Sequence, residues 1–141
     1  MVTAAPIVKS VARWALAVTM IGVGIAHFWA PDPFVRMMPA ALPLHLELVW
    51  ISGFFEVLGG VGLLWERSRL WAGWGLIALY ICVFPSNINM AVHGIMPEGV
   101  ELPIWLLWAR LPFQAVFIGW AFWVSRADPG VRSEGSSHET A

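Results

Sequence analysis

The segment LVWISGFFEVLGGVGLLW, residues 48–65, contains one ionisable side chain, Glu56, among apolar and small residues. A helix needs about 20 mostly apolar residues to cross a bilayer. With the preceding residues this stretch predicts a membrane-spanning helix over about residues 46–65. Three further stretches of the same kind, about residues 7–28, 70–89 and 104–124, predict three more spans.

The composition of the whole chain agrees with four spans. Its 141 residues are 59% hydrophobic and 12% charged, with a mean hydropathy of +0.72, whereas a soluble domain averages about 45–50% apolar and about 25% charged residues. A soluble fold of this size cannot cover so much apolar surface. The net charge of −1 offers no basic surface to nucleic acid. We therefore expect a small polytopic membrane protein whose first partner is the lipid bilayer, with no nucleic-acid partner.

The basic residues that flank the spans predict the orientation. Six lie at the chain ends or between the second and third spans, whereas the other two loops hold only Arg36; the six are Lys9, Arg13, Arg67, Arg69, Arg126 and Arg132. Cytoplasmic loops carry an excess of Lys and Arg. We therefore expect both termini on the cytoplasmic side of a plasma membrane, the inner membrane of a bacterium.

The expected fold class is all-α, an antiparallel bundle of four transmembrane helices in a single domain, residues 1–127. The very short loop between the second and third spans requires a helical hairpin there. Four prolines between the first two spans bound an apolar piece, Phe34 to Met38, which predicts a short interfacial helix or, alternatively, a lid over a pocket. Residues 128–141, rich in Gly, Ser and Glu, predict a disordered cytoplasmic tail.

Two charges lie inside the apolar spans, and ionisable groups at such positions are functional candidates because they are costly in a bilayer. Glu56 shares a helical face with small residues and should point into the bundle. Arg110 and Gln114, four apart in the last span, share a face. Residue counting places Glu56 and Arg110 at similar depth, which predicts a buried Glu56–Arg110 ion pair supported by Gln114. Such a pair would either fix helix register only or line a ligand or proton site.

Further polar residues fall in the same half of the predicted bilayer. His27 ends the first span, and Asn87 and Asn89 follow Pro85, which should kink the third span. These residues predict an outward-facing pocket for a small amphipathic ligand, formed by His27, Glu56, Asn87, Asn89, Arg110 and Gln114. Aromatic side chains are expected as its walls, with Phe28, Trp50, Phe54, Trp105, Phe113 and Phe117 as candidates.

No residue pattern identifies a cofactor. Met90, His93 and Met96 have soft ligand atoms suited to Cu(I), but methionine is common in apolar proteins and the helix is expected to stop before Met96. No haem, zinc or phosphate-binding motif is present. The single cysteine, Cys82, lies in an apolar run and is expected to be an inert small hydrophobe.

Several short motifs resemble the DoxX-like family of small four-span membrane proteins, and the resemblance covers about residues 8–125. They are GIAHF at 24–28, MMP at 37–39 after Phe34, SGFFEVLGG at 52–60, PSNINM at 85–90 and WARLPFQ at 108–114. The resemblance implies that His27, Glu56, Asn89, Arg110 and Gln114 correspond to the family's characteristic polar residues. Having only one cysteine, the chain differs from members that would work through thiol pairs.

The resemblance implies a role in redox homeostasis, since some members look like subunits of thiosulfate:quinone oxidoreductases. We therefore expect a redox-associated subunit that binds a quinone- or lipid-like molecule, with quinone as the candidate cofactor. A related branch, the NACHO-type proteins, assists channel assembly, so a non-enzymatic assembly factor is the alternative, and an oligomeric transporter or channel subunit is the second. A redox or membrane protein and a second copy of the chain are the candidate partners. Whether the protein is an enzyme stays open.

Overall fold

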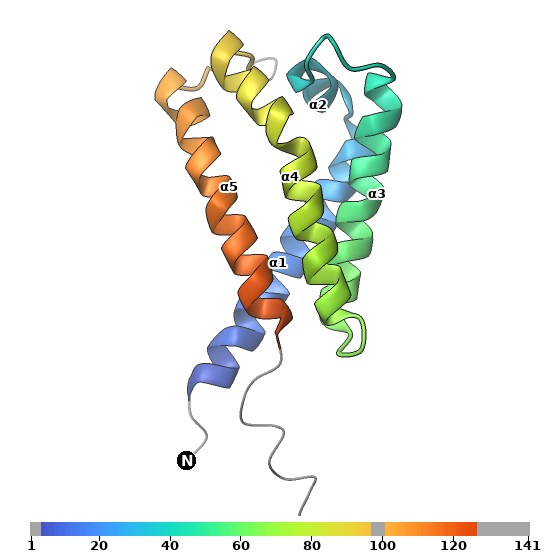
Figure 1. The fold of residues 1–141 in the computed structure, drawn as a ribbon, viewed down its shortest axis with the longest axis vertical. Coiled ribbons are helices and arrows are strands. Elements are labelled where there is room, and N and C mark those ends of the chain that lie inside the picture. Colours follow the sequence, from blue (N-terminus) through green and yellow to red (C-terminus); the bar gives the residue numbers. More distant parts are fainter. Residues whose placement is uncertain (1–3, 97–100, 127–141) are drawn as a thin grey trace, which may run out of the picture.

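The computed structural model describes residues 4–96 and 101–126. In these ranges the chain is α-helical and has no strand. The helices are α1 (Ala4–Trp29), α2 (Asp32–Met37), α3 (His45–Leu64), α4 (Arg69–His93) and α5 (Ile104–Ser125) (Figure 1). The expected tail at residues 128–141 lies outside the described ranges.

Four of these helices, α1, α3, α4 and α5, are long and apolar enough to cross a membrane. This confirms the predicted all-α fold with four spans. Three spans begin and end within a few residues of the predicted limits, but α4 continues past residue 89 to His93. Pro85 lies inside the helix, as in the predicted span, and the helix ends at Gly94, which has the left-handed conformation (φ 61°) that glycine adopts easily. The short helix α2 occupies the predicted position between the first two spans.

The long helices pack as two neighbouring pairs, α1 with α3 and α4 with α5, and α3 also packs against α4. The two described ends of the chain and the α3–α4 turn lie at one end of the bundle, called here the terminal end (Figure 1). The short helix α2 lies at the opposite end, called here the α2 end. Consecutive long helices run antiparallel, as the hairpin argument predicts.

Glycines bring α1 and α3 into backbone contact. A Cβ atom built on Gly24 would lie 2.6 Å from the carbonyl oxygen of Gly53, and one built on Gly53 would lie 2.6 Å from Cβ of His27. No side chain fits in either place. Small residues at helix interfaces allow this close approach in membranes, where packing drives association.

The terminal half of the bundle is filled by one apolar cluster centred on Leu16, Leu63, Leu76 and Val124. The guanidinium group of Arg13 lies buried beside it, and its Nε donates to the carbonyl oxygen of Val124 at 3.0 Å. This bond satisfies one of the carbonyls that the last turn of a helix leaves without an N–H partner.

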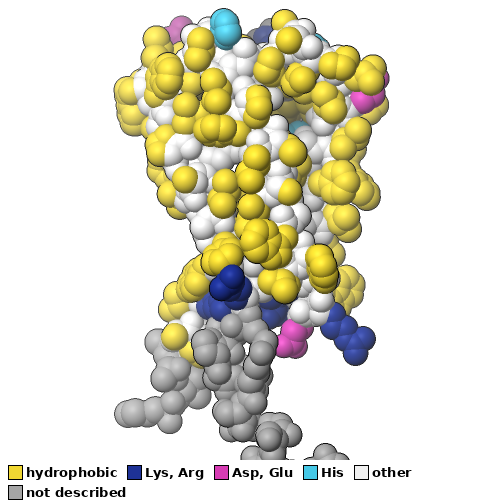
Figure 2. All heavy atoms as spheres, in the orientation of Figure 1, with side chains coloured by type: hydrophobic (Ala, Val, Ile, Leu, Met, Phe, Trp, Pro, Cys, Tyr) yellow, Lys and Arg dark blue, Asp and Glu magenta, His cyan; other side chains and the backbone are white. Residues whose placement is uncertain are grey.

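The outer surface of the helices is largely apolar. Only 17–33% of the most apolar window of each spanning helix is buried inside the bundle. Figure 2 shows hydrophobic side chains over the whole middle of the visible face, with the coloured charged side chains gathered at its two ends. This distribution suits a surface that faces lipid between two polar boundaries.

Candidate functional site

A cavity of about 600 Å³ lies between the helices in the half of the bundle nearer α2. On its terminal side it meets the apolar cluster at Met20 and Tyr80, which belong to both. All five helices contribute to its wall. The polar side chains in the wall are Thr19, His27, Ser52, Glu56, Tyr80, Ser86, Asn87, Arg110 and Gln114. Five of the six residues predicted for the pocket therefore line one cavity, and Asn89 does not.

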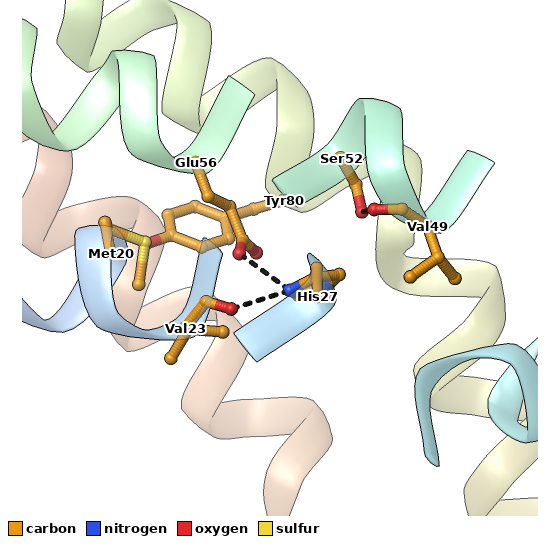
Figure 3. Close-up of polar contacts among 7 residues, drawn as sticks. All are labelled: Met20, Val23, His27, Val49, Ser52, Glu56 and Tyr80. Atoms are coloured by element: carbon orange, nitrogen blue, oxygen red, sulfur yellow. Dashed lines mark hydrogen bonds and ion pairs between the residues drawn. The ribbon is translucent and has the colours of Figure 1, made fainter. Parts of the chain in front are cut away.

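The buried carboxylate of Glu56 faces His27 across the α1–α3 interface (Figure 3). Oε2 of Glu56 lies 3.3 Å from Nδ1 of His27, and both residues are more than 90% buried. The glycine contacts explain this proximity, because Gly24 and Gly53 each precede the polar residue by three positions, which is one turn on the same helical face. The backbone contact between the glycines thus brings the next turn's side chains together.

The hydrogen bonds of His27 determine which ring nitrogen carries a proton. Nδ1 lies 2.8 Å from the carbonyl oxygen of Val23, which can only accept, so Nδ1 is the donor. Oε2 of Glu56 is buried and receives no hydrogen bond from a described residue. The 3.3 Å contact with His27 is consequently a close polar contact outside hydrogen-bond geometry. A buried acceptor left without a donor costs about 1–3 kcal/mol.

Tyr80 lies beside Glu56 with its hydroxyl directed elsewhere (Figure 3). The hydroxyl donates to Sδ of Met20 at 2.9 Å. A thioether sulfur is a weak acceptor, so this bond ties α4 to α1 only weakly. The ring of Tyr80 also packs against Phe117, with centroids 5.9 Å apart.

Gln114 joins α5 to α4 through both ends of its amide. Its Nε2 donates to the backbone carbonyl of Tyr80, and its Oε1 accepts from Nδ2 of Asn87. These contacts lie beside Pro85, which has no N–H to give to the preceding turn of α4. Gln114 is therefore a bracing residue between two kinked helices, since α5 also contains an internal proline, Pro112.

The Gln114 bridge predicts an energetic coupling that a double-mutant cycle measures. Gln114→Ala and Asn87→Ala should each lower the free energy of unfolding by about 0.6–2 kcal/mol, the range for interhelical hydrogen bonds in membranes. The double variant should lose less than the sum, because either change already removes the shared bond. Unfolding of detergent-solubilised protein by sodium dodecyl sulfate, followed by circular dichroism, gives the four free energies. Strict additivity would show that the bridge contributes no stability.

The helix α2 covers the cavity at its end of the bundle. The ring of Phe34 stacks on that of His27, with centroids 3.8 Å apart and planes inclined by 23°. Asn89 lies beside α2 and donates from Nδ2 to the carbonyl oxygen of Met37 at 3.0 Å. The prediction of Asn89 as a pocket residue is therefore wrong; its amide ties α4 to the end of α2.

The predicted Glu56–Arg110 ion pair is also wrong, since no contact within 4 Å joins these two described side chains. Arg110 lines the cavity but is exposed, and it has no ion pair or hydrogen bond with another described residue. Counting residues along helices gives similar depths but not lateral distance. The tight α1–α3 packing gives Glu56 a histidine neighbour, whereas Arg110 belongs to the other helix pair.

The aromatic wall differs from the predicted one as well. Phe113 and Phe117 line the cavity as expected. The other four candidates, Phe28, Trp50, Phe54 and Trp105, lie outside it and are exposed on the surface of the bundle. The aromatic residues that sequence reasoning missed are Phe34, Phe55 and Tyr80. The position of Tyr80 two turns before Asn87 on α4 could have indicated it.

Comparison with protein families identifies a family to which the chain is similar. The family described as "Domain of unknown function (DUF8561)" matches residues 16–125. The chain belongs to this family. No curated protein and no solved structure matches the chain.

The residues matched to DUF8561 include every polar residue of the cavity wall. Cys82 also lies in this wall, and its side chain is exposed. Among residues 4–96 and 101–126, no three His, Cys, Asp or Glu side chains lie close enough together to hold a metal ion.

Proposed function

We propose that this DUF8561 protein is an integral membrane protein that binds a quinone- or lipid-like small molecule in the cavity and serves a membrane redox system. The observation that carries the proposal is a cavity of about 600 Å³ with apolar walls and a small cluster of polar groups. Ligand sites have volumes of about 300–1,000 Å³ and this composition. The resemblance of the 24–28, 52–60, 85–90 and 108–114 motifs to DoxX-like proteins supports the redox context.

The position of the cavity supports a ligand that comes from the bilayer. Cavity residues on several helices, including Ile51, Phe55, Cys82 and Phe113, are also exposed on the apolar outer surface. A molecule dissolved in the hydrocarbon core can therefore reach the wall without crossing water. We propose that its tail lies among these side chains and its polar head lies near Glu56.

The polar residues suggest separate roles in holding such a ligand. Glu56 and His27 place a carboxylate acceptor beside an imidazole, a side chain that exchanges protons near neutral pH. Arg110 offers guanidinium donors at the exposed part of the wall. The amide of Gln114 is engaged with Asn87 and Tyr80, so we assign it to holding the shape of the site.

We propose that the terminal end faces the cytoplasm. Arg67 and Arg69 lie at the α3–α4 turn, and Arg126 follows α5, so exposed positive charge gathers at this end. The excess of Lys and Arg on the cytoplasmic side of membrane proteins supports this orientation. The polar cavity would then lie in the outer half of a plasma membrane.

Binding is favoured over conduction by the closed terminal half of the bundle. Leu16, Leu63 and Val124 are fully buried beneath the cavity, so an apolar layer separates it from the terminal end. A channel or transporter built from this chain would need to form between subunits. An assembly factor would instead be recognised by a bound membrane protein, which the following experiment also detects.

Native mass spectrometry of protein extracted with its lipids tests the proposal. We expect a bound amphiphile, identified as a quinone or lipid by solvent extraction and chromatography. Glu56→Gln should reduce its retention about 5- to 10-fold, the equivalent of about one hydrogen bond. Glu47→Gln, the same substitution on the exposed first turn of α3 outside the cavity, should retain the wild-type amount.

Two results would contradict the proposal. One is the absence of any bound or exchangeable amphiphile in protein taken directly from its native membrane. The other is equal retention by the wild type, Glu56→Gln and Glu47→Gln, which would place the molecule on the outer surface. A stoichiometric membrane protein in place of a small molecule would support the assembly factor.

A further inference from the structure

The carboxylate of Glu56 has an acceptor atom that the described chain does not satisfy. Glu56 is 8% exposed, lies in the cavity wall, and its Oε2 has no hydrogen-bond donor among the described residues. Hydrocarbon offers no water to replace a missing partner. Oε2 is itself enclosed against His27, so a donor in the cavity would have to approach this carboxylate from its other oxygen.

The neighbouring donors already have other partners. The Nδ1 proton of His27 is directed at Val23, 2.8 Å away, and the Tyr80 hydroxyl donates to Met20. On the same helix as Glu56, the Ser52 hydroxyl donates to the carbonyl of Val49 at 2.9 Å (Figure 3).

The donors on the other helices around the cavity that are named here do not bond to Glu56 either. Thr19 on α1 donates to the carbonyl oxygen of Ala15 at 2.8 Å. The amide of Asn87 donates to Gln114, whose own amide donates to the backbone carbonyl of Tyr80. Arg110, the cation in the wall, makes no contact with Glu56. This arrangement leaves room for a donor supplied by a bound molecule.

The wall around Glu56 indicates the shape of that molecule's head. Rings of Phe34, Phe55, Tyr80, Phe113 and Phe117 line the cavity. Aromatic rings pack favourably against one another in offset or edge-on arrangements. A cationic head would have to lose its hydration on entering such an apolar wall, which is costly, whereas a neutral hydroxyl is desolvated more easily.

We propose that the cavity selects amphiphiles with a phenol-type head, whose hydroxyl donates a hydrogen bond to the carboxylate of Glu56 while the ring packs among the aromatic side chains. This inference rests on the proposed binding function and specifies its ligand. It requires a hydroxyl donor, so the reduced, hydroxyl-bearing form of a quinone-like ring fits and a form with carbonyl acceptors only does not.

A matched pair of probes tests the donor directly. In the methyl ether of a long-chain 4-alkylphenol a methyl group replaces the hydroxyl proton, which removes the hydrogen-bond donor, and neither probe needs a redox partner. Native mass spectrometry in lipid nanodiscs, corrected for partition into the lipid, should give at least tenfold tighter binding of the phenol by the wild type. Glu56→Gln should reduce this preference to less than threefold, and Glu47→Gln should keep it.

A spectroscopic measurement on the wild type guards against a folding defect in the variant. The infrared difference spectrum should show a shifted carboxyl band when the phenol binds and no shift with the ether. Equal binding of both probes by the wild type overturns the inference but leaves the proposed function standing. A preference that survives in folded Glu56→Gln also overturns it. Binding of neither probe, together with no co-purifying amphiphile, removes the proposed function itself.

Discussion

Gly53→Ala is expected to lower the free energy of unfolding by about 1–3 kcal/mol, the usual cost of overpacking, with the upper end expected here. The added Cβ would lie 2.6 Å from Cβ of His27 and 2.8 Å from the carbonyl oxygen of Gly24. Both atoms belong to or adjoin the backbone of α1 and cannot turn away. The two helices must separate, and the separation also moves His27 away from Glu56.

Gly22→Ala is the matched control for this prediction. It changes a glycine on α1 whose added Cβ would meet nothing within 4 Å. Alanine favours a helix over glycine by about 1 kcal/mol, so this variant should be as stable as the wild type or slightly more so. Unfolding in mixed detergent micelles, followed by circular dichroism, measures both. Similar free energies for the two variants would mean that α1 and α3 do not meet at Gly53.

Ser86→Phe is expected to reduce ligand retention at least tenfold while leaving the bundle folded. Ser86 follows the proline kink in α4, is half-buried, and lines the cavity. Its small side chain leaves room that a benzyl group would occupy, so the ligand would be excluded by volume alone. A tenfold loss corresponds to about 1.4 kcal/mol of binding free energy, which the loss of a few packed carbon atoms readily reaches.

Ile88→Phe is the control for Ser86→Phe, because it adds the same ring outside the cavity. Ile88 lies two residues further along α4, is 39% exposed, and does not line the cavity. Its replacement should leave retention unchanged, as measured by native mass spectrometry of both proteins from the same membrane preparation. If Ser86→Phe retains as much amphiphile as Ile88→Phe, the cavity is not where the molecule binds.

Helix positions followed directly from hydrophobic length. The most apolar stretches needed only their composition to be assigned as spans, and the observed helices agree within a few residues except at the end of α4. The predicted end at residue 89 falls four residues before the observed end at His93, although both lie beyond Pro85. Proline predicts a disturbance of the helix, but a helix can continue past it when a neighbouring side chain, here Gln114, bonds to a carbonyl next to the kink.

The pocket residues were identified by a weaker rule, that polar groups inside a bilayer must face the protein. In the structure His27, Glu56, Asn87 and Gln114 line the cavity. Arg110 also lies in the wall, but it does not form the predicted ion pair with Glu56. A side chain that faces the inside of the bundle still has many possible neighbours, and the lateral packing of the helices decides which of them it contacts.

The sequence by itself determined that this chain has four membrane spans, that α2 lies between the first two, and that a few polar residues face inward. Hydrophobic burial depends on composition and period, which can be read along one chain. Tertiary structure alone decided that Glu56 faces His27 rather than Arg110, that Asn89 holds α2, and that one carboxylate oxygen lacks a donor. These pairings depend on how closely two helices approach, and glycine-mediated backbone contact between α1 and α3 sets that distance.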